Sequence, residues 1–315
     1  MSSPIQRTGT VIRRAGVVRV AVFVIIGVIW GSNFLFVKVA VMTMSPEAYV
    51  LLRSVAAVLM LASLTAASGE RLTPPRDRAA LTDIILCGLT YNLVPVTALA
   101  IGERYISSAL ASILTVTTPI WTTALTRLTI RDDRPTVVNY VGLILGLVGT
   151  ALLVAPGLGN SNMTSRSQVG AILVVVAAVS TAVSFLIQQR RLSHFHPLQS
   201  ALWQMEATVL MAIPSAYFMT DHLEVSLAGM MAVLFVGFLA AGVALAAFFW
   251  LLREWGPRRA STVCYLLPIT GMALGTTILH EKLTSLMLLG LVVTVVGLLA
   301  STDTLDIGRW ITLKR

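Results

Sequence analysis

Two charged residues, Arg53 and Glu206, fall deep inside long apolar segments of the sequence. A charge at the centre of a bilayer costs at least about 2.5 to 3.5 kcal/mol on insertion scales, so each needs a partner, a water-filled cavity or a nearby interface. Arg53 could bind a carboxylate through a bidentate contact, and Glu206 could balance that charge or carry a proton. A permanent ion pair that only joins two parts of the chain is the alternative interpretation.

The positions of these two charges within their segments predict similar depths. Arg53 follows Pro46 by seven residues, and Glu206 follows Pro197 by nine. At about 1.5 Å per residue, from opposite faces of a core about 30 Å thick, their backbones would differ in depth by about 6 Å. The sequence therefore predicts that both side chains face one central cavity.

Further polar or helix-breaking residues inside apolar segments extend this candidate pathway. Ser32 and Asn33 follow Gly31, a combination that allows close helix approach and presents hydrogen-bonding groups, although packing alone could explain it. Pro119 and Pro268 each expose a backbone carbonyl one turn earlier, or they could only bend their helices for packing. The predicted pathway residues are Trp30, Ser32, Asn33, Arg53, Tyr91, Asn92, Thr115, Thr118, Pro119, Gln204, Glu206, Tyr265 and Pro268.

Catalytic and metal-binding patterns do not accompany these residues. The sequence has no G-x-S-x-G run, and His280-Glu281 lacks the second histidine of a zinc-protease helix. It also has no nucleotide-binding loop and nothing that resembles an ion-channel filter. We therefore expect no catalytic residue, no metal site and no cofactor, with a membrane-embedded enzyme or a channel as the less favoured classes.

The composition places the candidate residues in a membrane. Hydrophobic residues make up 56% of the 315 and charged residues 12%, with a mean hydropathy of +0.85. An ordinary soluble domain has about a quarter of its residues charged. The net charge of +9 is not accompanied by a nucleic-acid recognition module, so no nucleic-acid partner is expected. Cys87 and Cys264 fall inside apolar runs, which indicates buried thiols without a disulfide framework.

Ten apolar segments are long enough to cross a membrane, which needs about 20 helical residues. They span residues 17–41, 47–67, 80–101, 106–128, 136–156, 169–188, 198–219, 226–251, 260–279 and 284–302. The predicted organisation is a tail over 1–16, a five-helix repeat over 17–156, a linker over 157–168, a second five-helix repeat over 169–302 and a tail over 303–315. Lysine and arginine concentrate in both tails and in alternate loops, which predicts cytoplasmic N and C termini and an external linker.

The two halves of the chain repeat one another. Thr136, Gly142 and Gly149 recur with the same spacing 148 residues later, as Thr284, Gly290 and Gly297. An odd number of spans per repeat gives the halves opposite orientations, an arrangement typical of secondary transporters whose site lies between the repeats. We therefore expect an all-α integral membrane protein of ten transmembrane helices in two inverted-topology repeats, although duplication could also have produced a larger structural bundle.

Several of these features together resemble the EamA-like family of the drug/metabolite transporter (DMT) superfamily, over about 20–155 and 169–302. They are the run Trp30 to Phe34, Pro46 with Arg53, the small residues Ala109 to Ile113 before Pro119, and the acid-threonine-glycine-glycine ending of each half. The resemblance implies a multi-pass carrier of the cytoplasmic (inner) membrane without a cofactor, often an exporter of amino acids or other small metabolites. A facilitative or drug-efflux carrier of the same fold is the alternative.

The resemblance also implies the partners, namely a small-molecule substrate and the lipid bilayer. A homodimer is compatible with the sequence.

Overall fold

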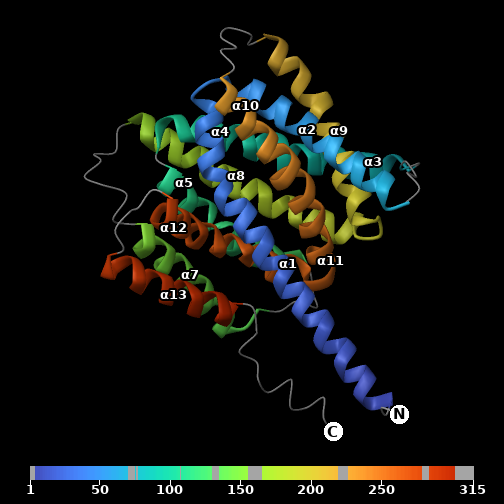
Figure 1. The fold of residues 1–315 in the computed structure, drawn as a ribbon, viewed down its shortest axis with the longest axis vertical. Helices are drawn as coiled ribbons and strands as arrows, with labels where there is room; N and C mark the ends of the chain where they lie inside the picture. The colour runs from blue at the N-terminus through green and yellow to red at the C-terminus, as the bar shows by residue number, and fades with distance from the viewer. Residues whose placement is uncertain are drawn as a thin grey trace.

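The computed structural model describes residues 4–69, 75, 77–106, 108–129, 135–154, 165–218, 226–278 and 284–301, and every regular element in these ranges is helical (Figure 1). The elements of the first half are α1 (Pro4–Val41), α2 (Pro46–Ala67), α3 (Arg78–Cys87), η1 (Gly88–Leu93), α4 (Val94–Tyr105), α5 (Ser108–Thr115), α6 (Thr118–Thr129) and α7 (Val137–Val154). Those of the second half are α8 (Ser165–Ile187), η3 (Gln188–Leu192), α9 (Pro197–Phe218), α10 (Leu227–Phe235), η4 (Val236–Val243), α11 (Ala244–Ser261), η5 (Thr262–Tyr265), α12 (Leu266–Ile278) and α13 (Ser285–Ser301). Most of the predicted linker, and the whole tail over 303–315, lie outside the described residues.

Five helical stretches within the described ranges are long and apolar enough to cross a membrane. They are Gly16–Val41, Pro46–Ala67, Arg78–Tyr105, Ser165–Leu192 and Leu227–Thr270, and the shorter apolar helices are Val137–Leu152 and Ser285–Ser301. Large apolar side chains also face outward, such as Ile144, Ile172 and Val292, which are each at least 60% exposed. Soluble monomers rarely expose apolar surface on this scale, so the chain is a multi-pass membrane protein.

The termini of several predicted segments differ from the sequence prediction. α1 begins at Pro4, so the helix extends through most of the predicted polar tail over 1–16. The predicted loop between 251 and 260 is reduced to a corner at Gly256, whose φ of 77° favours glycine. Beyond this corner, Arg258 is buried and donates to the backbone oxygen of Ser301 at 3.2 Å. A guanidinium is favourable there because the last carbonyls of α13 lack intrahelical donors.

Two long helices contain π-helical segments at matching positions. η1 joins α3 to α4, and η4 joins α10 to α11. Gly88 and Val236, which begin these segments, are separated by 148 residues, the same interval that separates Thr136 from Thr284. A π segment adds a residue to a helical turn and rotates the side chains that follow. The duplication therefore extends from sequence spacing to an unusual feature of the backbone.

The helices also break just before the two prolines singled out in the sequence. α5 ends at Thr115 and α6 begins at Thr118, immediately before Pro119. In the second half, the 3-10 segment η5 precedes α12, which contains Pro268. The hydroxyl of Thr118 donates to the carbonyl of Thr115 at 2.7 Å, the carbonyl that Pro119 leaves without its helical donor.

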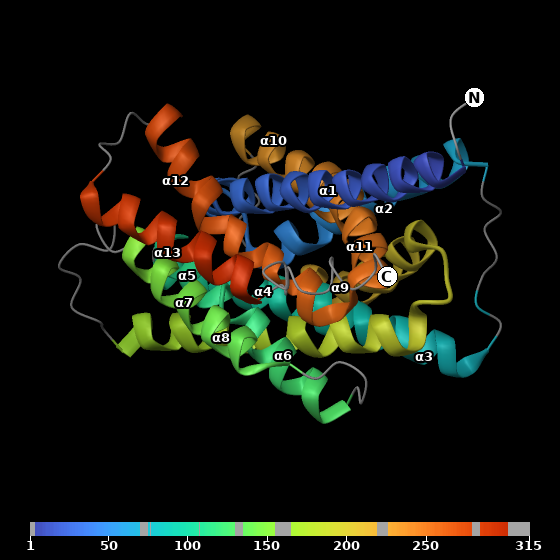
Figure 2. The ribbon, with the colours of Figure 1, turned by 90° about the horizontal axis from the view of Figure 1, so that it is seen from below.

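Contacts between the halves come in corresponding pairs. α2 packs on α9, and α7 packs along α13. Figures 1 and 2 both show α7 and α13 side by side. α1 packs on α12 and on the helix formed by α10, η4 and α11; α8 packs on α5, α6 and α4. α1 and α8 lie on opposite sides of the bundle in Figure 2. The largest buried apolar cluster includes Ile26, Leu61, Phe185, Met205 and Phe248, so both halves contribute to one core.

Candidate functional site

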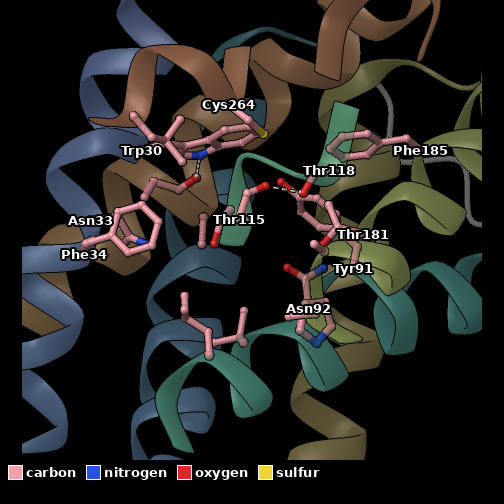
Figure 3. A pocket seen from close by; sticks show the side chains of 18 of the residues that line it. Trp30, Asn33, Phe34, Tyr91, Asn92, Thr115, Thr118, Thr181, Phe185 and Cys264 are labelled. Carbon is pink, nitrogen blue, oxygen red and sulfur yellow. Dashed lines mark hydrogen bonds between the residues drawn. The ribbon is translucent and has the colours of Figure 1, made fainter. Parts of the chain in front are cut away.

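A cavity of about 140 Å³ lies at the centre of the bundle, where both halves meet (Figure 3). Its first-half lining comes from α1, α2, η1, α4, α5 and α6, and its second-half lining from α8, η4, η5 and α12. The lining residues are Trp30, Asn33, Phe34, Arg53, Tyr91, Asn92, Pro95, Val96, Leu99, Thr115, Thr118, Ala177, Ala178, Thr181, Phe185, Ala240, Ala241, Cys264 and Leu267. The cavity is mostly apolar, with a few polar groups that converge on it.

Three polar side chains of the lining have buried atoms without a hydrogen-bond partner in the described part of the chain. They are the Nε and one terminal nitrogen of Arg53, both amide atoms of Asn92, and the Oδ1 of Asn33. Arg53 is only 6% exposed and Asn92 is fully buried. Because buried polar groups are almost always hydrogen-bonded, unsatisfied donors and acceptors around one cavity indicate that a ligand or water completes them.

Aromatic side chains form the apolar wall of the cavity. Trp30 is fixed by a hydrogen bond from its indole Nε1 to the carbonyl of Ala240, 3.0 Å away, which joins α1 to η4 (Figure 3). The rings of Tyr91 and Phe185 lie 5.7 Å apart between centroids. These contacts hold rigid flat surfaces beside the guanidinium of Arg53, so the site combines one permanent positive charge with apolar walls.

The local backbone explains how the polar lining is positioned. Tyr91 and Asn92 belong to the π segment η1, whose extra residue directs both side chains toward the cavity. Thr115 and Thr118 flank the break between α5 and α6. π segments and broken helices within membrane proteins are frequently found at functional sites.

Seven of the thirteen predicted pathway residues line this cavity: Trp30, Asn33, Arg53, Tyr91, Asn92, Thr115 and Thr118. Pro119 and Pro268 are buried beside lining residues but do not line it themselves. The hydroxyl of Ser32 bonds to the carbonyl of Ile29 within its own helix. The hydroxyl of Tyr265 donates to the carbonyl of Leu143 at 3.0 Å, so it joins η5 to α7 instead.

Gln204 belongs to a separate buried polar cluster. Its Nε2 donates to the Oε1 of Gln188 at 2.6 Å and contacts the hydroxyl of Ser200 at 3.1 Å. The Ser200 hydroxyl also bonds to Gln188, at 3.0 Å. We call Gln188, Ser200 and Gln204 the glutamine cluster. It ties the end of α8 and η3 to the first turns of α9.

The predicted approach of Glu206 to Arg53 is wrong. Glu206 is exposed on α9, on the same side as the exposed Leu210 and Ile213. Ser200, Gln204 and Thr208 follow one another at four-residue intervals on the buried side of the helix. The position of Glu206 around the helix therefore directs it away from the cavity.

Several lining residues were not singled out from the sequence. Thr181 and Phe185 are one turn apart on α8, and only the polarity of Thr181 inside an apolar run could have indicated them. Ala240, Ala241 and Leu267 are ordinary apolar residues that carry no such signal. In the described ranges, no group of three or more His, Cys, Asp or Glu side chains could hold a metal ion.

Comparisons with known proteins agree with this architecture. The model of the EamA-like transporter family matches residues 19–155 and 168–302, which confirms the resemblance and both repeats. The uncharacterized transporter YoaV of Bacillus subtilis is 24% identical over 278 residues, which cover 88% of this chain and 94% of the relative. The uncharacterized inner membrane transporter YedA of Escherichia coli is 26% identical and covers 87% of each chain.

Two further matches extend the comparison. A probable amino-acid metabolite efflux pump of Escherichia coli is 24% identical over 285 residues, which cover 86% of this chain and 90% of the relative. A protein of known crystal structure superposes with a TM-score of 0.74 over 91% of this chain and 96% of its own, at 14% identity. The second match shows a shared fold.

Proposed function

Because this chain belongs to the EamA-like transporter family, we propose that it exports a small amphipathic metabolite of the amino-acid class across the cytoplasmic membrane by alternating access. The observation that carries the substrate class is Arg53, a buried guanidinium that lines the cavity with unsatisfied donors. A guanidinium binds a carboxylate through two parallel hydrogen bonds. The unsatisfied amide of Asn92 supplies a further donor and acceptor on the same cavity.

The size and walls of the cavity favour a small ligand with an apolar part. A cavity of roughly 150 Å³ in another protein holds one benzene molecule. The 140 Å³ here, bordered by Trp30, Phe34, Tyr91 and Phe185, therefore suits a compact metabolite better than a bulky drug. The Escherichia coli relative named a probable amino-acid metabolite efflux pump supports both the substrate class and the direction of export.

Equivalent contacts in the two halves support ten spans in two inverted repeats. Arg53 follows Pro46 by seven residues, as Gln204 follows Pro197. A Cβ added to Gly237 in η4 would lie 2.7 Å from the carbonyl oxygen of Arg53, and one added to Gly88 in η1 would lie 3.0 Å from that of Gln204. The π segments η1 and η4 thus each approach the equivalent residue of the other half. Inverted repeats with the site between them are a common architecture of transporters that work by alternating access.

The equivalent residues Arg53 and Gln204 have different surroundings. This difference supports the interpretation that the structure represents one of two alternating states. Arg53 lines the cavity without a described hydrogen-bond partner, whereas Gln204 is held in the glutamine cluster. Exchange of the two conformations between the halves would break this cluster and bring Gln204 to the pathway. The corresponding breaks before Pro119 and Pro268 are places where the backbone could adjust.

A metabolite profile tests the proposed function. Cells that over-express the protein should enrich one or a few amino acids or related metabolites in the medium, relative to cells that express Arg53→Ala at the same level. Enrichment of added drugs instead would favour the drug-efflux alternative. Equal profiles for the two proteins would contradict a substrate site at Arg53.

Cysteine labelling tests the proposed orientation. Both native cysteines, Cys87 and Cys264, are buried, so new cysteines at the exposed Arg166 and Arg190 can be read against a low background. These positions lie at opposite ends of the helix formed by α8 and η3. A membrane-impermeant maleimide should label Arg166→Cys in intact cells, and Arg190→Cys only after permeabilisation. The reverse pattern would invert the topology and place both termini outside.

A further inference from the structure

Glu103, near the end of α4, is a buried acid that the proposed substrate site does not use. Its side chain has no exposed surface, and neither carboxyl oxygen has a hydrogen-bond partner in the described part of the chain. An isolated ionised carboxylate without hydrogen bonds is among the most costly groups to bury in a protein. A neutral carboxylic acid is far less costly, because burial no longer opposes a full charge.

The neighbours of Glu103 include one cation, Lys38, that could balance the negative charge of an ionised carboxylate. Lys38 on α1 donates from its Nζ to the backbone oxygen of Glu103, not to its carboxylate. On α2, Tyr49 interacts electrostatically with both Glu103 and Arg53, and the half-buried Glu47 lies in the first turn. Arg104, the next residue along α4, is exposed and directed to the carbonyl of Met44 at 3.5 Å.

The other helices packed on α4 add no titratable group at this point. α8 meets α4 closely where Gly170 lies against Gly102, and the only titratable residue of α8 is Arg166, which is exposed. α5 contains no ionisable side chain, and η1 contains only Tyr91. A single acid with one nearby ammonium group therefore occupies this buried end of α4. One carboxyl group is too few ligands for a resident metal ion.

Glu103 lies on the side of α4 that continues the cavity wall. Asn92, Val96 and Leu99 line the cavity, and their intervals of four and three residues continue to Glu103 four residues later. Residues at these intervals share one side of a helix. Glu103 is thus one turn beyond the cavity, near the end of the stretch Arg78–Tyr105.

We propose that Glu103 is a proton-binding site that is occupied while this end of the bundle is closed around it. An O–H bond forms at one carboxyl oxygen with a proton from water before closure. The same bond breaks, and the proton returns to water, when the helices separate and the ionised carboxylate can be solvated or approach Lys38. Only the link to substrate movement rests on the proposed function; the binding of the proton does not.

Infrared difference spectroscopy of the purified protein tests this proposal without a substrate. The wild-type protein should show the carbonyl stretch of a protonated carboxylic acid, shifted in heavy water and lost on alkaline titration. Glu103→Gln, which keeps the shape of the side chain, should lack this band. Glu254→Gln is the matched control, because Glu254 pairs with Arg19 at 2.6 Å on the surface and should not contribute to the band.

Carbodiimide labelling of the wild-type protein supplies a second measurement that no folding defect can affect. A membrane-permeant carbodiimide adds to protonated carboxyl groups, and mass spectrometry should find the adduct on the peptide that contains Glu103. The proposal is overturned if the wild-type band is absent, if it survives in Glu103→Gln, or if Glu206→Gln removes it instead. An adduct confined to Glu206 or Glu47 would likewise contradict it, because these are the other acids inside helices that have no ion pair among the described residues.

Discussion

Substitution of Arg53 by Gln is expected to raise the KM for the proposed substrate by about 10- to 100-fold while the protein stays folded. A hydrogen bond to a charged group contributes about 1.5 to 3 kcal/mol, and every 1.4 kcal/mol corresponds to about tenfold in affinity. The KM of Arg53→Lys should lie between those of the wild type and Arg53→Gln, because an ammonium keeps the positive charge but lacks the planar guanidinium that binds a carboxylate with two hydrogen bonds. Substrate exchange in proteoliposomes measures the KM, with the metabolite identified in the medium as the labelled probe.

Thermal stability separates substrate binding from a structural role for Arg53. Removing one partner of a buried ion pair costs about 3 to 5 kcal/mol, because the other charge is left unpaired. Arg53 has no ion pair among the described residues, so Arg53→Gln should not lower the unfolding temperature. Arg104→Gln is the matched control, because Arg104 is exposed on the neighbouring helix and should leave KM unchanged. A large loss of stability at an unaltered KM would show that Arg53 is structural.

Gly297→Ala is expected to destabilise the protein by about 1 to 3 kcal/mol or more, the range found when atoms are added to a fully packed interior. A Cβ at this position would lie 2.3 Å from the backbone nitrogen of Gly146 and 2.7 Å from the carbonyl oxygen of Gly142. Both are backbone atoms of α7, so the clash can be relieved only if α13 moves away from α7. Small residues allow such close helix contact within membranes.

The measurement for Gly297→Ala is the unfolding temperature of the purified protein in detergent. Gly16→Ala is the control, because an added Cβ there meets no atom within 4 Å. The control should be at least as stable as the wild type, because alanine favours an exposed helical position over glycine. Equal unfolding temperatures for all three proteins would mean that α7 and α13 do not hold the contact described here.

The family, the duplication and much of the cavity could be predicted from the sequence because apolar segments are interrupted by few polar residues. Arg53, Asn92 and Thr115 stand out among such residues, and each lines the cavity. The membrane environment provides this contrast, since a polar side chain there requires a reason. The same contrast could not indicate Ala240 or Leu267, whose contribution depends only on where their helices cross.

Angular position around a helix was the main quantity that the sequence did not provide. Glu206 was predicted to face the cavity, but it lies on the exposed side of α9. The π segments add a second uncertainty, because η1 and η4 rotate the rest of their helices relative to a regular α-helix. No local residue pattern in Gly88–Leu93 indicates that a π turn occurs there. Glu103 was missed for a related reason: beside Arg104 near a segment end, it looks like an ordinary interfacial charge.

Under the proposed alternating access, the glutamine cluster implies that the protein without substrate is not evenly distributed between two states. Each hydrogen bond in the cluster contributes about 0.5 to 1.5 kcal/mol, and three of them join Gln188, Ser200 and Gln204. The buried Oε1 of Gln204 has no partner among the described residues and cancels part of this gain. Arg53 makes no hydrogen bond in the described part of the chain that would cancel the rest. A bias of about 1.4 to 2.8 kcal/mol corresponds to a population ratio of about 10 to 100.

This population ratio affects substrate binding. For a ligand that binds only the minor state, the apparent affinity equals the intrinsic affinity multiplied by the fraction of molecules in that state. Under the proposed mechanism, the same metabolite would therefore bind with apparent affinities that differ by about that factor between the two faces of the membrane, although its contacts within the site were the same.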